Sequence, residues 1–593
     1  MLKYLLIFLV FLSFSPGFAQ NDQLAQAYMD KGEYEKALST YKELLKSEPG
    51  NTLYLQGMVS SYQQLENFQA AEELLQNRLK TSGNNPTFLI ELGYNLELQK
   101  KQEEANQFYE KAVGSLAEKP AFTYSVAREF EKYSLLDYAI KAYNIGIQQA
   151  PEMKYELPLA RIYGEKGNFN EMFSTYLDLM EKDPEINSNL VREFDRYITE
   201  DPANKANEAL RNNLLQRLQK NPSLFYNQLL GWLFVQQKDF RKAFIQEKSI
   251  YKREHQDLGR IMQLSIIAKS AGDLDAAKEI IAFIIKETPS TDILLQAKQL
   301  LLNMKVETAS NNEYSEIEKE YAEVLKEYPS GTESLGIKID AANFLAFKEQ
   351  KIKEAEDLLN AISLDALSNF QKAAVKMALG DILVLDEKFN QALIYYSQVG
   401  NLVKNDEIAQ NALYKVAKTS YYKGDFDWAQ TQLKVLKESV TQLIANDAME
   451  LSLLIQENSQ EDSTHTALKL YAQADLLAYQ QKQEQAIQIL NKILEEHKGE
   501  SIEDEALLKQ AQLFVKIGEY PKAEANYLKI LQFYTGDILA DNAAFELAGL
   551  YEKLHQPEKA MEFYSRIIFN YPDSIYFVDA RKNYRKLRGD DIN

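Results

Sequence analysis

The chain has 593 residues, of which 45% are hydrophobic and 26% charged, so it is long enough for several domains or an open-ended array and too apolar for a disordered protein. Its formal net charge of -20 opposes nucleic-acid phosphates at long range, which excludes nucleic acid as an expected partner. It has only 23 glycines and 14 prolines, and this scarcity of turn residues favours helices over strands.

Residues 1–19 have the features of a secretory signal peptide. Lys3 supplies the positive charge, residues 4–14 form an apolar run, and Gly17 and Ala19 are the small residues before a cut after Ala19. The run is too short to cross a bilayer comfortably, although an uncleaved anchor stays an alternative. Removing the segment also removes the charge of Lys3 and leaves -21. We expect an exported, periplasmic protein, soluble or peripherally bound, with no integral membrane segment after cleavage.

No residue pattern indicates catalysis. The chain has no cysteine, which excludes a lipid-modified cysteine anchor, a disulfide, a thiol nucleophile and a thiolate metal site. No two of the four histidines have the spacing of metal ligands on a helix, and no phosphate-binding loop or nucleophile elbow occurs. We therefore expect no catalytic residue, no metal and no cofactor.

Residues 20–184 repeat with a period of about 34 residues. Ala37 is followed by four equivalent small or apolar residues at spacings of 34, 34, 34 and 33: Ala71, Ala105, Ala139 and Met172. Around each anchor, a small residue usually stands twelve positions before, a large one nine before, and tyrosine or leucine four after. Such a pattern predicts pairs of helices, because the small residues allow close approach and the aromatic residues fill the gaps between pairs.

Glycine and proline mark the ends of the predicted helices. Gly32 and Gly167 lie where the first helix of a pair must end in a left-handed turn. Proline ends the second helix because it cannot continue one. It stands twelve residues after six anchors, at Pro49, Pro151, Pro184, Pro289, Pro329 and Pro572.

The pattern resembles the tetratricopeptide repeat, or TPR. The best unit is residues 86–119, whose residues on the family's signature spacing are Leu92, Gly93, Leu96, Ala105, Tyr109 and Ala112. The resemblance implies an all-α fold, a solenoid of helix-turn-helix units wound into a right-handed superhelix. It also implies that the first helix of each pair lines a concave surface.

The array continues to the C-terminus with changes of period. Residues 185–222 predict an irregular helical spacer, and TPR-like repeats resume over 223–330. Repeats of about 37 residues occupy 331–445, and the C-terminal TPR repeats with a capping helix occupy 446–588. The later anchors are Ala243, Ala277, Ile317, Ala355, Ala392, Ala429, Ala486, Ala523 and Ala560. The gap of 57 residues after Ala429 includes a polar stretch, 456–466, that we expect to be an exposed loop.

The last repeats carry a further resemblance. Residues 501–588, with a longer unit, a YPDS break and a following helix that contains DAR, resemble periplasmic TPR proteins of the BamD and YbgF kind. Those proteins assist outer-membrane protein assembly and envelope constriction, so the resemblance implies a role in the cell envelope. The BamD-like proteins are lipoproteins, whereas this chain has no cysteine to carry a lipid.

Five residues of the expected concave surface form the first candidate binding site. Arg128 and Arg161 occupy equivalent positions in adjacent repeats, with Lys132 one turn after Arg128 and with Tyr94 and Tyr124 close by. In so acidic a chain this group predicts a local anion pocket with aromatic walls. The alternative is that the basic residues form weak surface ion pairs with nearby glutamates such as Glu129, Glu131 and Glu165.

The second candidate site is the basic C-terminal helix. The densest positive run of the chain lies at 580–588 and comprises Arg581, Lys582, Arg585, Lys586 and Arg588. It is either a docking helix for an acidic partner or an anionic lipid, or a polar cap that keeps the last repeat soluble.

Together these features favour a non-enzymatic scaffold. We expect it to bind one or more proteins or extended peptide segments, with outer-membrane and secretion components as candidates, and to serve envelope assembly or secretion. Two alternatives stay open: an enzyme, or an accessory subunit of one, that acts on cell wall or glycan, and a structural protein that associates with itself.

Overall fold

The computed structural model describes residues 17–81, 85–254, 258–329, 332–404, 406–436, 442–459 and 465–590. The chain divides into two compact units, 1–250 and 251–593, and each is described by itself. Of the predicted signal peptide, residues 1–16 lie outside the described residues, and residues 17–19 begin the first described helix. Within the described residues there is no strand, and no helix is long and apolar enough to cross a bilayer.

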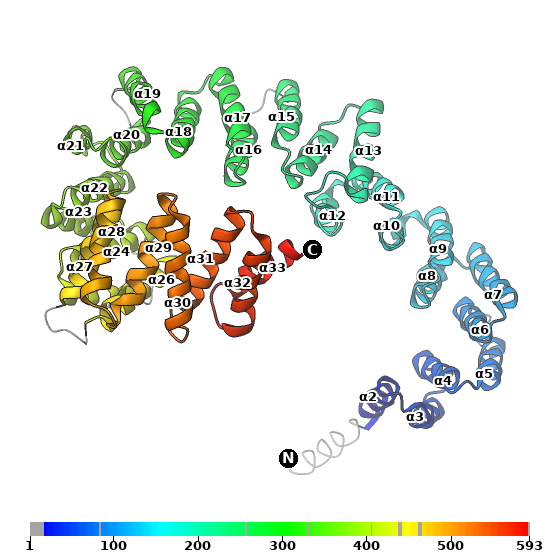
Figure 1. The fold of residues 1–593 in the computed structure, drawn as a ribbon. Helices are drawn as coiled ribbons and strands as arrows, with labels where there is room; N and C mark the ends of the chain where they lie inside the picture. Colours follow the sequence, from blue (N-terminus) through cyan, green and yellow to red (C-terminus); the bar gives the residue numbers. More distant parts are fainter. Residues whose placement is uncertain are drawn as a thin grey trace, which may run out of the picture. The chain divides into compact units, whose positions relative to one another are not determined.

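The first unit is a curved stack of helix pairs (Figure 1). Its helices are α2 (Gly17–Asp30), α3 (Tyr34–Ser47), α4 (Thr52–Gln64), α5 (Phe68–Thr81), α6 (Pro86–Leu98), α7 (Gln102–Gly114), α8 (Thr123–Lys132), α9 (Leu136–Gln149), α10 (Glu156–Glu165), α11 (Phe169–Lys182), α12 (Asn187–Phe194), α13 (Lys205–Lys220), α14 (Leu224–Gln236) and α15 (Phe240–Glu254). Short 3-10 turns occur at Ser115–Ala117, Pro120–Phe122, Pro151–Met153 and Pro184–Ile186.

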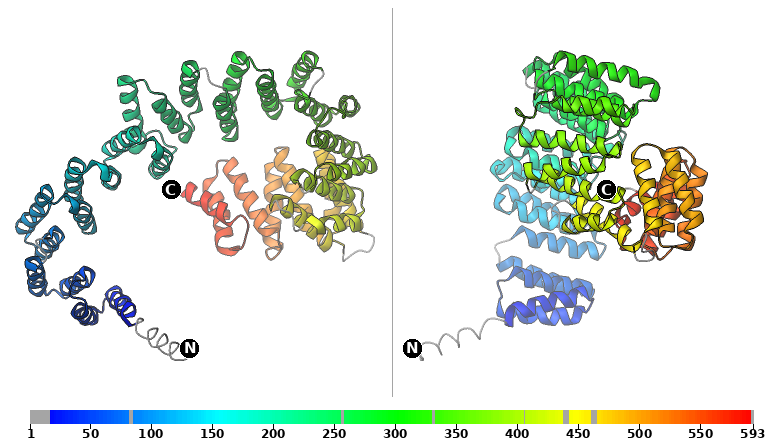
Figure 2. Two further views of the ribbon diagram at one scale, coloured as in Figure 1. Left: turned by 180° about the vertical axis from the view of Figure 1, so that it is seen from behind. Right: turned by 90° about the vertical axis from the view of Figure 1, so that its left-hand side faces the viewer.

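The second unit continues with helices of the same kind, among which α29 to α33 lie in a row (Figure 2). They are α16 (Gly259–Ser270), α17 (Leu274–Glu287), α18 (Thr291–Thr308), α19 (Tyr314–Glu327), α20 (Leu335–Phe347), α21 (Ile352–Asn360), α22 (Asn369–Leu385), α23 (Phe389–Leu402), α24 (Glu407–Tyr422), α25 (Phe426–Leu436), α26 (Gln442–Glu457), α27 (Thr466–Tyr479), α28 (Gln483–Glu496), α29 (Ile502–Lys516), α30 (Tyr520–Phe533), α31 (Ala540–Lys553), α32 (Pro557–Asn570) and α33 (Phe577–Arg588). One 3-10 turn lies at Asn311–Glu313.

The anchor residues of the sequence pattern form the centre of each helix pair. All thirteen alanine or methionine anchors have an exposed fraction of 0%, and Ile317 has 3%. Glycine lets the helices approach closely, because an added Cβ at Gly93 or Gly380 would overlap the ring of Tyr109 or Tyr396 respectively. The predicted period is therefore confirmed as the packing period of the core.

The turn inside nearly every pair has the same left-handed conformation. A residue with positive φ lies five positions before thirteen of the fourteen anchors, which confirms the left-handed turns predicted at Gly32 and Gly167. Only five of these thirteen residues are glycine. The other eight have a side chain, so their left-handed conformation is higher in energy than it would be for glycine. The left-handed residues are Gly32, Glu66, Lys100, Ser134, Gly167, Lys238, Gly272, Gln350, Glu387, Gly424, Gln481, Gly518 and His555.

The predicted spacer, 185–222, is helical and packs into the first unit. Helices α12 and α13 bury Leu190, Phe194 and Leu210. The Asn207 amide donates hydrogen bonds to the carbonyl oxygens of residues 199 and 201, at 2.7 and 2.6 Å, and so fixes the turn between the two helices.

Helix α26 is an additional helix in the 57-residue gap. It packs on α25 and α24, where Gln430 and Ser452 exchange hydrogen bonds of 2.6 and 2.8 Å. Helix α27 returns to α24 and α22, and Gln480 donates a 3.0 Å hydrogen bond to the Leu385 carbonyl oxygen. Of the loop expected at 456–466, residues 460–464 lie outside the described residues. The first part is not an exposed loop, because α26 continues to Glu457 and Asn458 is buried.

Candidate functional site: a groove in the C-terminal repeats

A cavity of about 520 Å³ lies where α26 faces the first helices of the last repeats. Its walls come from α24, α26, α27, α29 and α31, and from the turns before α31 and α33 (Figure 1). We call it the C-terminal groove. Its apolar and aromatic lining consists of Tyr414, Met449, Leu451, Leu453, Leu454, Tyr471, Leu508, Ile538, Leu539, Ile575 and Tyr576. The remaining lining is polar or charged and is largely acidic.

Two isoleucines of the groove expose most of their surface. Ile538 and Ile575 stand fifteen residues after Ala523 and Ala560 and have exposed fractions of 61% and 79%. Met449 of α26 is also exposed. A single exposed apolar side chain is ordinary, but several around one cavity form a patch typical of an interaction site.

The floor of the groove contains a buried carboxylate held between two lysines. Asp475 of α27 accepts hydrogen bonds from Lys418 Nζ of α24 at 2.6 Å and from Lys509 Nζ of α29 at 2.5 Å. Burial by itself would raise the pKa of Asp475, but the two ammonium groups hold the pKa below its ordinary value. The three-residue bridge therefore ties together three helices that line the groove.

A second buried carboxyl group lies toward the end of α26. Glu505 of α29 has an exposed fraction of 9%, and its Oε1 accepts a 3.2 Å hydrogen bond from Asn458. Its Oε2 has no hydrogen-bond donor among the described residues. Burial, together with the adjacent Asp504 carboxylate, raises the pKa of Glu505 to about 9. Glu505 is therefore protonated at neutral pH.

The lining of the groove is strongly acidic overall. Seven acidic and two basic residues line it, and both basic residues, Lys418 and Lys509, are bound to Asp475. The acidic lining residues are Asp447, Glu450, Glu457, Asp475, Glu505, Asp541 and Asp573. The groove therefore has a negative field over an apolar surface, and this combination favours a cationic and apolar ligand.

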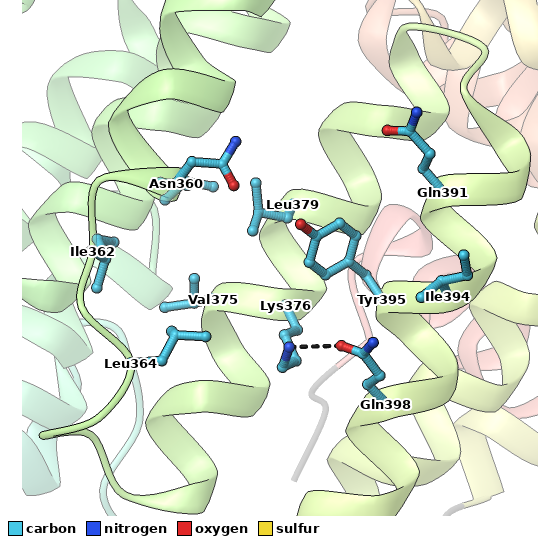
Figure 3. Close-up of a pocket in the computed structure, with 11 residues that line it drawn as sticks. Asn360, Ile362, Leu364, Val375, Lys376, Leu379, Gln391, Ile394, Tyr395 and Gln398 are labelled. Atoms are coloured by element: carbon cyan, nitrogen blue, oxygen red, sulfur yellow. Dashed lines mark hydrogen bonds between the residues drawn. The ribbon is translucent and has the colours of Figure 1, made fainter.

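A second cavity of the same unit has a different character. It measures about 420 Å³, lies between α21, α22 and α23, and contains one charged lining residue, Lys376 (Figure 3). The Lys376 ammonium donates a 2.6 Å hydrogen bond to Gln398, and its Nζ lies 5.4 Å from the centre of the Tyr395 ring. Ile394 at its edge has an exposed fraction of 58%. This surface therefore lacks the acidic lining of the C-terminal groove.

The residues of the first candidate site are paired within the first unit. Arg128 forms an ion pair of 2.7 Å with Glu131, and Arg161 lies 3.8 Å from Glu193. Lys132 forms ion pairs with Glu91 and Glu129, and Tyr124 is exposed. The surface ion pairs weighed as the alternative are therefore present for Arg128 and Lys132. A partner-binding role for the five residues stays a prediction.

A carboxylate that the sequence analysis did not single out organises that surface. Glu91 of α6 is buried, and it accepts hydrogen bonds from Lys132 Nζ at 3.0 Å and from the Tyr133 hydroxyl at 2.8 Å. The Tyr133 ring stacks on Tyr94 with centroids 3.8 Å apart. Lys132 also pairs with Glu129 at 2.7 Å. Burial raises the pKa of Glu91 to about 7.

The basic C-terminal residues lie on α33, the last described helix. Arg588 pairs with Asp590, and Arg585 lies 3.4 Å from the same carboxylate. The Arg581 guanidinium lies 5.9 Å from the centre of the Phe577 ring. Only Ala580 of this helix is buried, so Lys582 and Lys586 belong to its outer face. Docking by this helix stays a prediction.

Comparison with known proteins agrees with the repeat pattern. Residues 22–53 and residues 508–575 each match a family model described as tetratricopeptide repeat. These two segments carry tetratricopeptide repeats. The second match covers much of the TPR surface that forms the C-terminal groove, from Leu508 to Ile575. No curated protein matches the chain.

Two solved structures with matching chains illustrate how far the likeness extends. One is "Structure of Naa15/Naa10 bound to HypK-THB", with 13% identity, 96% of each chain covered and a TM-score of 0.29. The other is "Crystal structure of APC/C hetero-tetramer Cut9-Hcn1", with 13% identity, 98% of each chain covered and a TM-score of 0.22. At these TM-scores neither structure carries an argument about this chain.

The C-terminal groove is not predicted from the sequence, although two features of the sequence are consistent with it. In α26 the apolar residues Ile444, Ala448, Leu451 and Ile455 recur at helical spacing, which would have predicted a helix in the 57-residue gap. Asp475 and Glu505 each lie among apolar residues of a TPR first helix. An acidic residue among apolar residues of such a helix indicates a polar group that faces the interior.

Proposed function

We propose that the chain is an exported, non-catalytic scaffold that holds a polypeptide segment of a partner protein in the C-terminal groove. The observation that carries the proposal is the groove itself, an open cavity of about 520 Å³ bordered by Ile538 and Ile575. Stacked repeats present extended inner surfaces of this kind to their partners.

The walls of the groove favour binding because they are held in place before a partner arrives. The rings of Phe545 and Tyr576 stack with centroids 4.5 Å apart, and Asn542 donates a 3.1 Å hydrogen bond to the Tyr576 hydroxyl. The Asp475 bridge fixes α24, α27 and α29. A preformed surface loses less conformational entropy on binding. Covering each exposed isoleucine then contributes about 1–2 kcal/mol.

We place this scaffold in the periplasm, in envelope assembly or secretion. This part of the proposal is supported by the signal-peptide features of residues 1–19 and by the resemblance of residues 501–588 to periplasmic TPR proteins of the BamD and YbgF kind. The matching tetratricopeptide-repeat model lies over the same C-terminal repeats.

The double substitution Ile538→Asp and Ile575→Asp tests the groove as the partner-binding surface. Both side chains are exposed, so the fold tolerates the change, while two added carboxylates oppose apolar contact in a groove that is already acidic. We expect affinity purification of the tagged chain from crosslinked native cells, quantified by mass spectrometry, to recover partners at least about tenfold less well.

Ile394→Asp is the control, because the exposed fraction of Ile394, 58%, is close to the 61% of Ile538 and the residue lies in the same unit outside the groove. It should leave the recovered partners unchanged. Equal recovery with the groove variant and the unaltered chain would contradict the proposal. Recovery of the bait alone from the unaltered chain would also contradict it.

A further inference from the structure

Carboxyl groups from three elements gather at one end of the C-terminal groove, and two of them, Glu457 and Glu505, line the cavity. Glu457 ends α26, Asp504 and Glu505 lie in the first two turns of α29, and Asp537 lies in the turn before α31. These groups interact electrostatically. Burial raises the pKa of Glu457 most, and the charges of Asp504 and Asp537 raise it further. Burial and Asp504 likewise raise the pKa of Glu505. We call these four residues the acidic end.

The acidic end has no cation of its own. Among the described residues, none of the four carboxyl groups forms an ion pair with lysine or arginine, whereas Asp475 in the same groove has two lysines. Lys509 is on the same helix as Asp504 and Glu505, but its Nζ is bound to Asp475 at 2.5 Å. Negative charge in the first turn of a helix complements the helix dipole, which accounts for Asp504. The dipole does not account for the gathering of four such groups.

Glu505 supplies an independent sign of a missing ligand. It is more than nine-tenths buried, it lines the cavity, and its Oε2 has no hydrogen-bond donor among the described residues. A buried polar atom without a partner costs about 1–3 kcal/mol, and such atoms are uncommon in native proteins. The Asn458 amide already satisfies Oε1, and Ser501 in turn donates a 2.8 Å hydrogen bond to Asn458. This arrangement orients the carboxyl group and leaves Oε2, the oxygen that carries the proton, at the cavity; a cation that binds there displaces the proton.

We infer that the acidic end binds an arginine or lysine side chain of the polypeptide that occupies the C-terminal groove, while the apolar residues beside that side chain cover Ile538 and Ile575. The inference rests on the proposed function and adds the chemistry of the partner. A basic, apolar segment matches both the carboxylates and the isoleucines, whereas an acidic segment would meet like charge. A metal ion fits less well, because no group of three or more His, Cys, Asp or Glu among the described residues has the arrangement of a metal site.

Binding of a cation to Glu505 is linked to its proton. Asn458, which follows α26, hydrogen-bonds to Glu505, and Asp504 on its own helix and Tyr471 of α27 lie close enough to interact with it electrostatically. Glu457 in turn interacts with Asp504 and Asp537. Since the pKa of Glu505 is about 9 without a ligand, a bound cation favours the ionised form and releases the proton. The affinity for a cationic segment therefore rises as pH rises from about 7 to about 9.

Two designed peptides test the inference on the mature full-length chain. Each is an amphipathic peptide of about 15 residues with leucine on one face. One has arginine between the leucines and the other has glutamine, and binding is followed by fluorescence anisotropy up to millimolar protein. We expect the arginine peptide to bind at least about tenfold more tightly. Asp504→Asn with Glu505→Gln should remove that advantage and the rise with pH.

The control variant is Glu495→Gln with Glu496→Gln, which replaces two acidic side chains by amides at exposed residues of α28 in the same unit, and so removes at least as much negative charge. It should keep both the preference for arginine and the rise with pH. Circular dichroism at both pH values verifies that each variant is folded.

The outcomes separate the inference from the proposed function. Equal binding of the two peptides, or an arginine preference that survives Asp504→Asn with Glu505→Gln, would overturn the inference and leave the groove as an apolar binding surface. If neither peptide binds and Ile538→Asp with Ile575→Asp leaves partner recovery unchanged, both would be overturned. If neither peptide binds although that variant loses the partners, only the cationic chemistry is rejected.

Discussion

Replacing Asp475 by asparagine is expected to destabilise the repeats around the C-terminal groove by about 3–5 kcal/mol, the usual cost of removing one partner from a buried ion pair. The substitution leaves Lys418 and Lys509 beside an amide that cannot neutralise them, in a site where the carboxylate is 7% exposed. Since long repeat arrays do not unfold in one step, the measurement is hydrogen exchange of α27 and α29 rather than one melting temperature. Their amides should exchange roughly a hundredfold faster or more.

Asp357→Asn is the control for this substitution. Asp357 forms an ion pair with Lys353 one turn earlier on α21, and the two side chains are 61% and 78% exposed. Such surface pairs contribute about 0.5 kcal/mol or less, so exchange in α21 should change by no more than about twofold. If Asp475→Asn has an effect as small as this control, the bridge does not hold the three helices together.

Replacing Glu91 by glutamine is expected to stabilise the first unit at pH 8. Burial raises the pKa of Glu91 to about 7 from an ordinary value of 4.5. The folded chain therefore retains a proton that the unfolded chain loses between about pH 4.5 and pH 7, and its stability falls as pH rises through that range. At about 1.4 kcal/mol per pKa unit, the loss approaches roughly 3 kcal/mol at pH 8.

Glutamine removes this loss while Lys132 keeps its 2.7 Å ion pair with Glu129. Hydrogen exchange of α6 at several pH values is the measurement. We expect wild type and Glu91→Gln to agree near pH 4 and the variant to be more protected at pH 8, by about 1–3 kcal/mol. Glu103→Gln, at an exposed position on α7, should keep the pH dependence of the wild type. A variant less protected than wild type at pH 8 would show that the ionised carboxylate stabilises the fold.

The sequence predicts the repeat fold well because one local pattern is used throughout. The anchor of nearly every pair is a fully buried alanine, such as Ala105 or Ala392, and it recurs at a regular spacing in the sequence. Where a tyrosine stands four residues later it is buried as well, and in several repeats its hydroxyl donates to a carboxylate, as Tyr143 does to Glu131 at 2.8 Å. These features depend on spacing within about 40 residues, which a sequence displays directly.

The C-terminal groove depends on contacts that no repeat pattern contains. Asp475 meets Lys418 across 57 residues of sequence, because α27 returns to α24 after the insertion of α26. The polarity of the segment after α26 suggested a loop, whereas Asn458 is buried and holds Glu505. Arg128, a basic residue of the binding site predicted from the sequence, forms an ion pair with Glu131 one turn away. A sequence shows which residues are charged, but not which of them form ion pairs with one another.

The binding of a basic polypeptide segment in the C-terminal groove is tested most directly by a photo-crosslinking amino acid placed at position 575 in living cells. Position 394, another exposed isoleucine of the same unit, is the comparator. The account predicts crosslinks from position 575 to a protein segment that carries arginine or lysine beside apolar residues, and none to that segment from position 394. Equal crosslinking from the two positions, or crosslinks from position 575 only to acidic segments, would contradict it.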